Sequence, residues 1–257
     1  MMRHTIIPAG GLGNRIRVIL SALQWQMDTG KNVRILWIQD EGLACSFEKL
    51  FMPITEVKEG RSLLCYKIFR KIYLHSPLRF IYAYNHNEYE NLRKWVKNPN
   101  GLLYSTSYSI FYNGSYPQYH DVFRLNADLQ KQLNKYTSQM GRNTIGIHIR
   151  RTDNLESMQH SPIQKFIDFI HSAIQENDTQ KFYLATDDQV VKEEIIQLFG
   201  DKIMTMDCVL RRDNEEGIRC ALLELYILSS CSKIIGSYYS SYSELAAQIG
   251  NIPLIIL

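Results

Sequence analysis

The chain has 257 residues, of which 45% are hydrophobic and 21% charged, and its 29 basic and 26 acidic residues give a net charge of +3. This length and composition are typical of a globular protein with one large domain or two lobes. So small a net charge excludes a polyanion such as a nucleic acid as the expected partner, and any bound anion should be small and local.

The cysteines and histidines point away from disulfide scaffolds and metal sites. The five cysteines are widely spaced without a C-x-x-C pair, and the seven histidines include no H-x-x-x-H pair. The N-terminus has no apolar signal-peptide core, and no apolar run reaches about 18 residues. We therefore expect a cytoplasmic protein with reduced cysteines, no integral membrane segment and no bound metal.

The first part of the chain predicts one βαβ unit. "HTIIPAG" (residues 4–10) is a short apolar strand that runs into the glycine-rich "GGLGN" (10–14). Apolar residues then recur at helical spacing from Ile16 to Met27, and Gly30 is expected to end this helix. "VRILWI" (33–38) follows as a second strand.

Residues 42–140 lack a clear period and predict only one helix, around 124–139. Several aromatic residues in this segment fit either a platform for an acceptor sugar or ordinary core packing. These are Trp95, Tyr104, Tyr108, Tyr112, Tyr116 and Tyr119.

From residue 144 onward strands and helices alternate regularly, which predicts a parallel sheet with helices on both faces. The change of pattern places a domain boundary near residue 140, with lobes 1–140 and 141–257. The expected strands are 144–150, 181–186, 202–206, 233–236 and 253–257, and the expected helices are 162–176, 189–199, 215–230 and 242–250.

The stretch "TIGIHIRRTD" (144–153) is a buried strand that ends in charge. Because side chains alternate along a strand, the three isoleucines should face the core while Gly146, His148 and Arg150 share the other face. Ligands of open parallel sheets bind at the carboxyl ends of the strands. We expect Arg150 to serve an anion and Arg151, near Asp153, to hold the loop, although a salt-bridged strand end has the same pattern.

Two acidic residues, Asp187 and Asp188, follow the strand 181–186 at the same edge of the sheet. Acidic residues favour the first turn of a helix, and Thr186 and Gln189 have the spacing of a capping box. The pair is therefore expected either to cap the next helix or to bind a ligand and orient a loop.

Glu224 stands in the middle of the apolar helix "CALLELYIL" (220–228), and no residue three or four positions away can pair with it. A buried carboxylate without a partner is costly, so a donor should meet it. The adjacent N–H groups of a guanine base would satisfy it. The alternative is a narrow solvent stripe through Gly217 and Glu224.

Serines crowd the turn "GSYYSSYSEL" (236–245) before the last predicted helix: Ser237, Ser240, Ser241 and Ser243. The N-terminal amides of that helix would attract a phosphate. Ser241 and Glu244 also have the spacing of a capping box, so at least one serine is expected to have a structural role.

These residues together resemble a known group of enzymes. "IGIHIRRTD" is similar to the H-x-R-R-x-D signature of the superfamily of α1,6-fucosyltransferases, nodulation fucosyltransferases and protein O-fucosyltransferases. "FYLATDD", "LLELYILSSCSKIIGS" and "YYSSYSELAAQI" follow in the same order, and "GGLGNRI" resembles the Gly-x-Gly-Asn loop of the first lobe. The resemblance covers 141–257 and 3–40.

The resemblance implies an α/β fold of two Rossmann-like lobes, glycosyltransferase B-type, with GDP-fucose bound in the C-terminal lobe and the acceptor facing the N-terminal lobe. It implies an inverting transfer of L-fucose to a glycan hydroxyl without a metal or other cofactor. A bacterial enzyme of this kind would decorate a polysaccharide precursor, with peripheral association to membrane-linked glycans.

The resemblance also assigns roles to residues. His148 and Arg150 would contact the diphosphate, Glu224 would read guanine, and Ser240 and Ser241 would bind phosphate. Asn14 would lie near the reaction centre. The acceptor hydroxyl must also lose its proton, for which Asp153 and Glu156 are the candidate bases. Further candidates for binding the nucleotide sugar are Arg151, Asp187, Asp188, Gly11 and Gly13.

Two other functions fit the sequence. The chain would bind a nucleotide sugar or glycan without turnover, or "GGLGNRI" with Asp40 would form the dinucleotide site of an NAD-dependent oxidoreductase. The dinucleotide fingerprint needs a third glycine where Ile16 stands, and its acidic residue comes earlier than Asp40.

Overall fold

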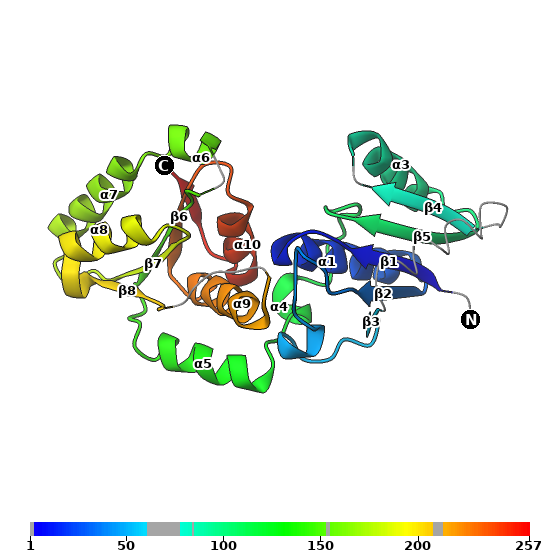
Figure 1. The fold of residues 1–257 in the computed structure, drawn as a ribbon, viewed down its shortest axis with the longest axis horizontal. Coiled ribbons are helices and arrows are strands. Elements are labelled where there is room, and N and C mark those ends of the chain that lie inside the picture. The colour runs from blue at the N-terminus through cyan, green and yellow to red at the C-terminus, as the bar shows by residue number, and fades with distance from the viewer. Residues whose placement is uncertain (1–2, 61–77, 84, 153–154, 208–212) are drawn as a thin grey trace. The chain divides into compact units, whose positions relative to one another are not determined.

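The computed structural model describes residues 3–60, 78–83, 85–152, 155–207 and 213–257 (Figure 1). The chain divides into two compact units, one formed by Met1–Asn126 with Arg211–Arg219 and the other by Ala127–Leu210 with Cys220–Leu257. Each unit contains one five-stranded sheet. The predicted class, α/β with two Rossmann-like lobes, is confirmed. The sequence placed the change of lobe near residue 140, whereas the helix α5 (Ala127–Thr137) already belongs to the second unit.

The sheet of the first unit has the strand order β3-β2-β1-β5-β4, and its described strand pairs are all parallel. Its strands are β1 (His4–Pro8), β2 (Val33–Trp37), β3 (Val57–Glu59), β4 (Leu78–Ala83) and β5 (Leu102–Ser107). Its helices are α1 (Leu12–Thr29), α3 (His86–Lys97), α4 (Tyr119–Val122) and the short 3-10 helix η1 (Phe47–Lys49). The sequence predicted β1, α1 and β2 but missed the other elements of this unit.

Helix α1 follows the predicted boundaries closely. It ends at Gly30, whose φ of 66° is the left-handed conformation that glycine adopts without strain. The ring of Trp25 on α1 contacts the His4 ring of β1 at 5.0 Å, and the Trp95 ring of α3 contacts it at 5.4 Å. Both helices therefore pack on the face of the sheet toward which His4 points.

The sheet of the second unit has the order β10-β9-β6-β7-β8, again with parallel pairs. Every strand and helix predicted from residue 144 onward is present, with ends shifted by at most one residue. Its strands are β6 (Ile145–Ile149), β7 (Phe182–Thr186), β8 (Ile203–Thr205), β9 (Lys233–Gly236) and β10 (Leu254–Ile256). Its helices are α5, α6 (Leu155–His160), α7 (Ile163–Glu176), α8 (Gln189–Phe199), η2 (Gly200–Lys202), α9 (Glu215–Ser229) and α10 (Ser241–Gly250). The sequence did not predict α6. The helix α9 begins in the first unit and continues into the second at Cys220.

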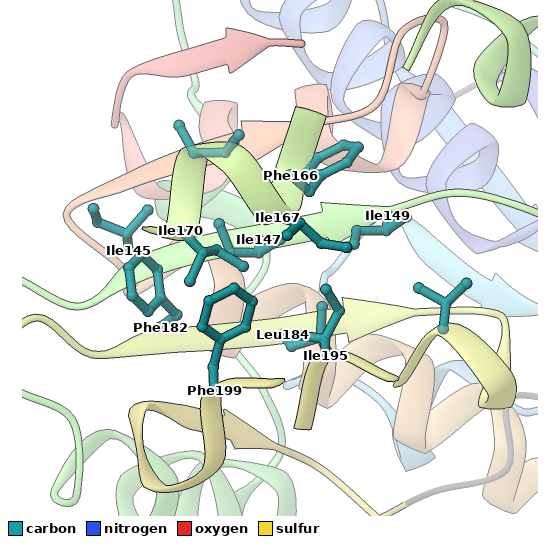
Figure 2. Packing of buried hydrophobic residues seen from close by; sticks show 12 residues of the cluster. Ile145, Ile147, Ile149, Phe166, Ile167, Ile170, Phe182, Leu184, Ile195 and Phe199 are labelled. Atoms are coloured by element: carbon teal, nitrogen blue, oxygen red, sulfur yellow. The ribbon is translucent and has the colours of Figure 1, made fainter. Parts of the chain in front are cut away.

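The core of the second unit fills one face of this sheet, as Figure 2 shows. The three isoleucines of β6 lie in it, as predicted, with apolar side chains of β7, α7 and α8. On the other face, a Cβ added to Gly146 would lie 3.0 Å from Leu228 and 3.2 Å from Cys231, so the end of α9 packs directly on β6. Helices therefore cover both faces, and buried β6 reads as an apolar run.

A glycine at the end of β9 makes α10 pack close to the sheet. A Cβ added to Gly236 would lie 2.8 Å from Oγ of Ser243 and 3.0 Å from Leu254. We expect Gly236→Ala to lower the free energy of unfolding by about 1–3 kcal/mol, because the neighbours must shift. Gly141→Ala, where the nearest atom would be 3.9 Å away, is the matched control and should change little. Urea denaturation measures both, and equal stability of the two variants would contradict this packing.

One expectation about cysteines is wrong. Cys220 is disulfide-bonded, whereas Cys45 and Cys231 are buried free thiols. Spacing along the chain does not reveal which cysteines the fold brings together. Within the described residues, none of the helices combines the length and the hydropathy that crossing a membrane would require.

Candidate functional site

His148 connects β6 to the start of α10. His148 is only 5% exposed. The Nδ1 atom of its ring lies 2.7 Å from the hydroxyl of Ser243 and 3.4 Å from that of Ser240. Burial lowers the pKa of His148 to about 4, because a charged imidazolium would lose its hydration. The ring is therefore neutral at pH 7 and brings no positive charge to the site.

Arg150 follows β6 and forms an ion pair with Asp187, with Nη1 and Oδ2 2.8 Å apart. The Arg150 side chain remains 23% exposed. The carboxylate of Asp187 also accepts hydrogen bonds from the backbone N–H of Arg151 and from the hydroxyl of Thr152, each at 2.8 Å. Asp187 thus orients the loop that carries Arg150, which is one of the two roles that the sequence allowed.

Arg151 is buried, and its guanidinium bonds to backbone carbonyls of the protein itself. It is 8% exposed, and its guanidinium donates to the carbonyl of Ser161 at 2.9 Å and to that of Arg150 at 3.1 Å. This arrangement matches the loop-holding role expected for the second arginine. The predicted neighbour Asp153 lies outside the described residues.

Asp188 caps helix α8. Its side chain accepts hydrogen bonds from the backbone N–H groups of Val190 and Val191 at 2.8 and 3.2 Å. The expected capping box of Thr186 and Gln189 is therefore replaced by Asp188 as the cap. The two acidic residues therefore have different roles, since Asp188 caps helix α8 and Asp187 orients the loop that carries Arg150.

Glu224 is buried in α9, with 6% exposure. Among the described residues its carboxylate makes no hydrogen bond or ion pair. Burial raises the pKa of Glu224 to about 8, although the charge of Lys192 acts in the opposite direction. The solvent-stripe alternative is wrong, because Gly217 is buried as well.

A second unsatisfied polar group lies near Glu224. The hydroxyl of Tyr183 on β7 is buried and has no hydrogen-bond partner among the described residues. Burial, and then the Glu224 carboxylate, raise the pKa of Tyr183. The Glu224 carboxylate also interacts electrostatically with Asp187, the ion-pair partner of Arg150. Among the described residues of the second unit, the unpaired Glu224 carboxylate therefore interacts electrostatically with the unpaired Tyr183 hydroxyl and with Asp187, the partner of Arg150.

Helix α10 begins beside His148. Ser240 is its N-cap, but the Ser240 side chain accepts no amide hydrogen bond from the first turn. The N–H of Glu244 bonds to the carbonyl of Ser240 at 3.4 Å, so the N-cap is Ser240, one residue before the Ser241 that the predicted capping box would use. Ser241 is the exposed first residue of the helix. The first amides of a helix have no intrahelical acceptor, so this end suits an anion.

The glycine loop lies in the first unit, between β1 and α1. Gly10 has a φ of +79°, and a Cβ there would lie 2.7 Å from the Tyr108 ring and 2.9 Å from the amide nitrogen of Asn14. Gly11 is the N-cap of α1, and Gly13 lies in its first turn. The sequence singled out Gly11 and Gly13, but Gly10 is the position that requires glycine.

Asp40, the acidic residue of the dinucleotide alternative, is already engaged. Its Oδ1 lies 2.7 Å from Nη2 of the fully buried Arg15, and it accepts the N–H groups of Gly42 and Leu43 at 2.9 and 3.1 Å. Arg15 also donates to the carbonyl of Gly10 at 2.8 Å. Asp40 therefore shapes the glycine loop, which argues against a role in binding a ribose.

Glu156 lies on α6 and is exposed. Its Oε2 is 3.5 Å from Nε2 of His160, and the two side chains are 64% and 56% exposed. Ser157, between them, donates its hydroxyl to the carbonyl of Arg150 at 3.2 Å. The short helix is thus tied to the arginine loop.

The aromatic residues of the segment 95–119 do not form one platform. Trp95 and Tyr119 are 5% and 6% exposed and pack in the core of the first unit. Tyr112 donates its hydroxyl to Asp28 at 2.8 Å, and Tyr116 is 55% exposed. Because this segment combines a helix, a strand and a loop, its regular spacing does not create a common face.

A cavity of about 280 Å³ lies at the opposite, amino end of the second sheet, where Ile145 and Lys233 begin β6 and β9. None of the candidate site residues lines it. Within the described ranges, no three histidine, cysteine, aspartate or glutamate side chains gather as metal ligands.

Several residues of the site escaped the sequence analysis. Tyr183 resembles any buried aromatic residue of a strand, and Thr152, Ser161 and Lys192 gain their roles only through the fold. Among them, Lys192 donates to the carbonyl of Met206 at 2.7 Å while its charge acts on Glu224. Only the position of Thr152 beside the arginines gave any signal in the sequence.

Comparison with known proteins gives matches in structure only. No sequence profile of a protein family matches the chain, and no curated protein matches its sequence. The fucosyltransferase NodZ from Bradyrhizobium matches with a TM-score of 0.68 at 15% identity, over 100% of this chain and 95% of that one. A mutant of Arabidopsis thaliana FUT1 matches with a TM-score of 0.64 at 15% identity, over 100% and 71%. POFUT1 matches with a TM-score of 0.55 at 12% identity, over 99% of each chain. The chain therefore shares the two-lobed α/β fold of these fucosyltransferases, as the motif resemblance implied.

Proposed function

We propose that this protein is a fucosyltransferase that takes L-fucose from GDP-fucose. The observation that carries the proposal is Glu224, a buried carboxylate without a hydrogen-bond partner among the described residues. Guanine presents two adjacent N–H donors that one ionised carboxylate accepts together. Structures of NodZ with GDP and with GDP-fucose, which have the same fold, support the choice of nucleotide.

The diphosphate is held by Arg150 and by the N-terminus of α10 in this proposal. Arg150 presents a planar cationic guanidinium, whose N–H groups can bind two phosphate oxygens at once. The amides of the first turn, with Ser240 and Ser241, add donors that carry no net charge. When Ser243 donates its hydroxyl to Nδ1 of His148, the neutral ring keeps its proton on Nε2 as a further donor.

The reaction breaks the bond between the anomeric carbon and the diphosphate oxygen, and the electron pair leaves with GDP. An acceptor hydroxyl attacks the anomeric carbon from the opposite side, which inverts its configuration, and its proton passes to a base. Glu156 or Asp153 is that base in the proposal. Arg150 and the helix end stabilise the leaving charge, so a metal ion is not required.

The first unit has the acceptor-facing role in this proposal. Asn14 stands beside Gly10, at the start of α1, where its amide would hydrogen-bond the sugars near the reaction centre. The glycine loop that positions Asn14 is shaped by the Arg15–Asp40 ion pair.

Calorimetry with GDP, UDP and NAD, followed by an assay of GDP release from GDP-fucose, tests the proposal. We expect GDP to bind at least about tenfold more tightly than UDP, NAD not to bind, and GDP-fucose to be hydrolysed slowly without an acceptor. GDP binding without hydrolysis or transfer over a panel of glycans would favour the non-catalytic alternative. Binding of NAD in place of GDP would contradict the proposal.

A further inference from the structure

Three aromatic rings form an exposed surface beside the start of α10. Tyr238 and Tyr239, in the loop between β9 and α10, are 42% and 77% exposed. Their ring centroids are 6.2 Å apart, and the Tyr238 ring is 4.6 Å from that of His160 on α6. We call His160, Tyr238 and Tyr239 the aromatic surface. Single exposed tyrosines are common, but adjoining rings from two elements are not explained by chance exposure.

The backbone holds the aromatic surface in place. Tyr239 has a φ of +54°, a left-handed conformation that side-chain-bearing residues rarely adopt and that glycine would adopt without strain. The N–H of Tyr238 donates to Oγ of Ser161 at 2.8 Å, which ties the loop to the end of α6. A strained residue that keeps a large exposed side chain is a reason to look for a binding role.

The aromatic surface adjoins the residues that would hold the diphosphate. The hydroxyl of Ser237, which directly precedes Tyr238, accepts the backbone N–H of Arg150 at 2.9 Å. Ser240, which directly follows Tyr239, contacts His148. A ligand on the rings would therefore lie close to a sugar whose diphosphate is bound by Arg150 and α10.

The chemistry of the three rings fits a sugar better than an aliphatic or charged partner. One face of a pyranose ring is lined by C–H groups, and its rim carries hydroxyls. Tyrosine offers an apolar face together with a hydroxyl that donates and accepts hydrogen bonds. Glu156, 3.5 Å from His160, adds a carboxylate acceptor at the edge.

We propose that His160, Tyr238 and Tyr239 hold a pyranose ring of the carbohydrate acceptor, next to the donor sugar. This proposal rests on the proposed function. It places part of the acceptor site on the second unit, on tyrosines other than those of the segment 95–119.

Saturation-transfer NMR with GDP-saturated protein tests it, using tetrasaccharides of glucose, galactose, mannose and N-acetylglucosamine as probes. The wild type and Tyr239→Phe should bind at least one of them, and Tyr239→Gly should bind it about tenfold more weakly. Tyr239→Gly should melt at the same temperature as the wild type or higher, because glycine relieves the strained φ. Tyr116→Ala removes an exposed ring elsewhere and should leave binding unchanged.

Other outcomes overturn the inference. Wild-type protein that binds GDP but none of the tetrasaccharides, or equal binding by Tyr239→Gly, would show that the rings hold no sugar. Self-association in sedimentation that Tyr239→Gly abolishes would assign the surface to a second copy of the chain. Absence of GDP binding would instead contradict the proposed function, so the two failures are distinguishable.

Discussion

Arg150→Lys is expected to slow the release of GDP from GDP-fucose by about 100- to 1000-fold while the protein stays folded. The leaving diphosphate gains negative charge in the transition state. A guanidinium binds two of its oxygens at once, while Asp187 fixes its orientation through the 2.8 Å ion pair. A lysine ammonium is a single point charge on a flexible chain and does not reproduce this geometry. The fall should therefore appear mainly in kcat.

Arg142→Lys is the matched control, because Arg142 is exposed just before β6 and has the same chemistry. Its turnover should equal that of the wild type, and circular dichroism should show both variants folded. Wild-type kcat in Arg150→Lys would remove this arginine from the reaction. Hydrolysis by water is the appropriate readout, because it needs no knowledge of the acceptor.

Strong periodicity explains which elements could be predicted. β6 and the longer helices α7, α8, α9 and α10 have clear apolar patterns, so their ends could be predicted within one residue, whereas the short helix α6 could not be predicted. β5 could not, because Ser105, Thr106 and Ser107 are buried polar residues in a strand. Two of these hydroxyls donate to backbone carbonyls, that of Ser105 to Ile81 and that of Ser107 to Ser109, and the sequence does not predict these hydrogen bonds. Helix α3 buries only Leu92, Trp95 and Val96, too few for a clear pattern.

The predicted ends of the strands indicated which residue types stand at the site, but they did not indicate which of those side chains pair with one another. Arg150 and Asp187 could be placed at one edge because each follows a predicted strand. Their ion pair depends on the register that sets Ile149 opposite Thr186, and only the fold gives that register. The unpaired hydroxyl of Tyr183 was equally hidden, since an isolated sequence shows a tyrosine but not the donors and acceptors around it.

Glu224→Gln is expected to weaken GDP binding by about 100-fold and UDP binding little. An ionised carboxylate accepts both N–H groups of guanine, whereas the glutamine amide offers one acceptor and sets an NH₂ against a donor. Calorimetry with each nucleotide measures the difference. Glu216→Gln, a charge-matched change at an exposed position of the same helix, is the control. Equal losses for GDP and UDP would contradict guanine recognition by Glu224.

The same carboxylate should make guanine binding depend on pH. Burial raises the pKa of Glu224 to about 8, so below that pH the free site holds a proton that guanine must displace. Affinity for guanosine should therefore rise between about pH 6 and pH 8, by up to about tenfold per unit, and then level off. Guanosine replaces GDP here because a terminal phosphate titrates near pH 6. Glu224→Gln should show no such rise, and a flat wild-type profile would contradict the raised pKa.

Stability should change with pH in the opposite direction. Between the ordinary value of 4.5 and the folded pKa of about 8, the folded chain keeps the Glu224 proton and the unfolded chain does not. The free energy of unfolding therefore falls as pH rises through this window, and above it the charged carboxylate costs on the order of a few kcal/mol. Urea denaturation should show Glu224→Gln more stable than the wild type at about pH 8.5, with the difference vanishing near pH 5. If Glu224→Gln were less stable than the wild type at pH 8.5, the Glu224 carboxylate would have a stabilising partner within the protein. If it were more stable but bound GDP poorly, the carboxylate would lower stability and serve ligand binding.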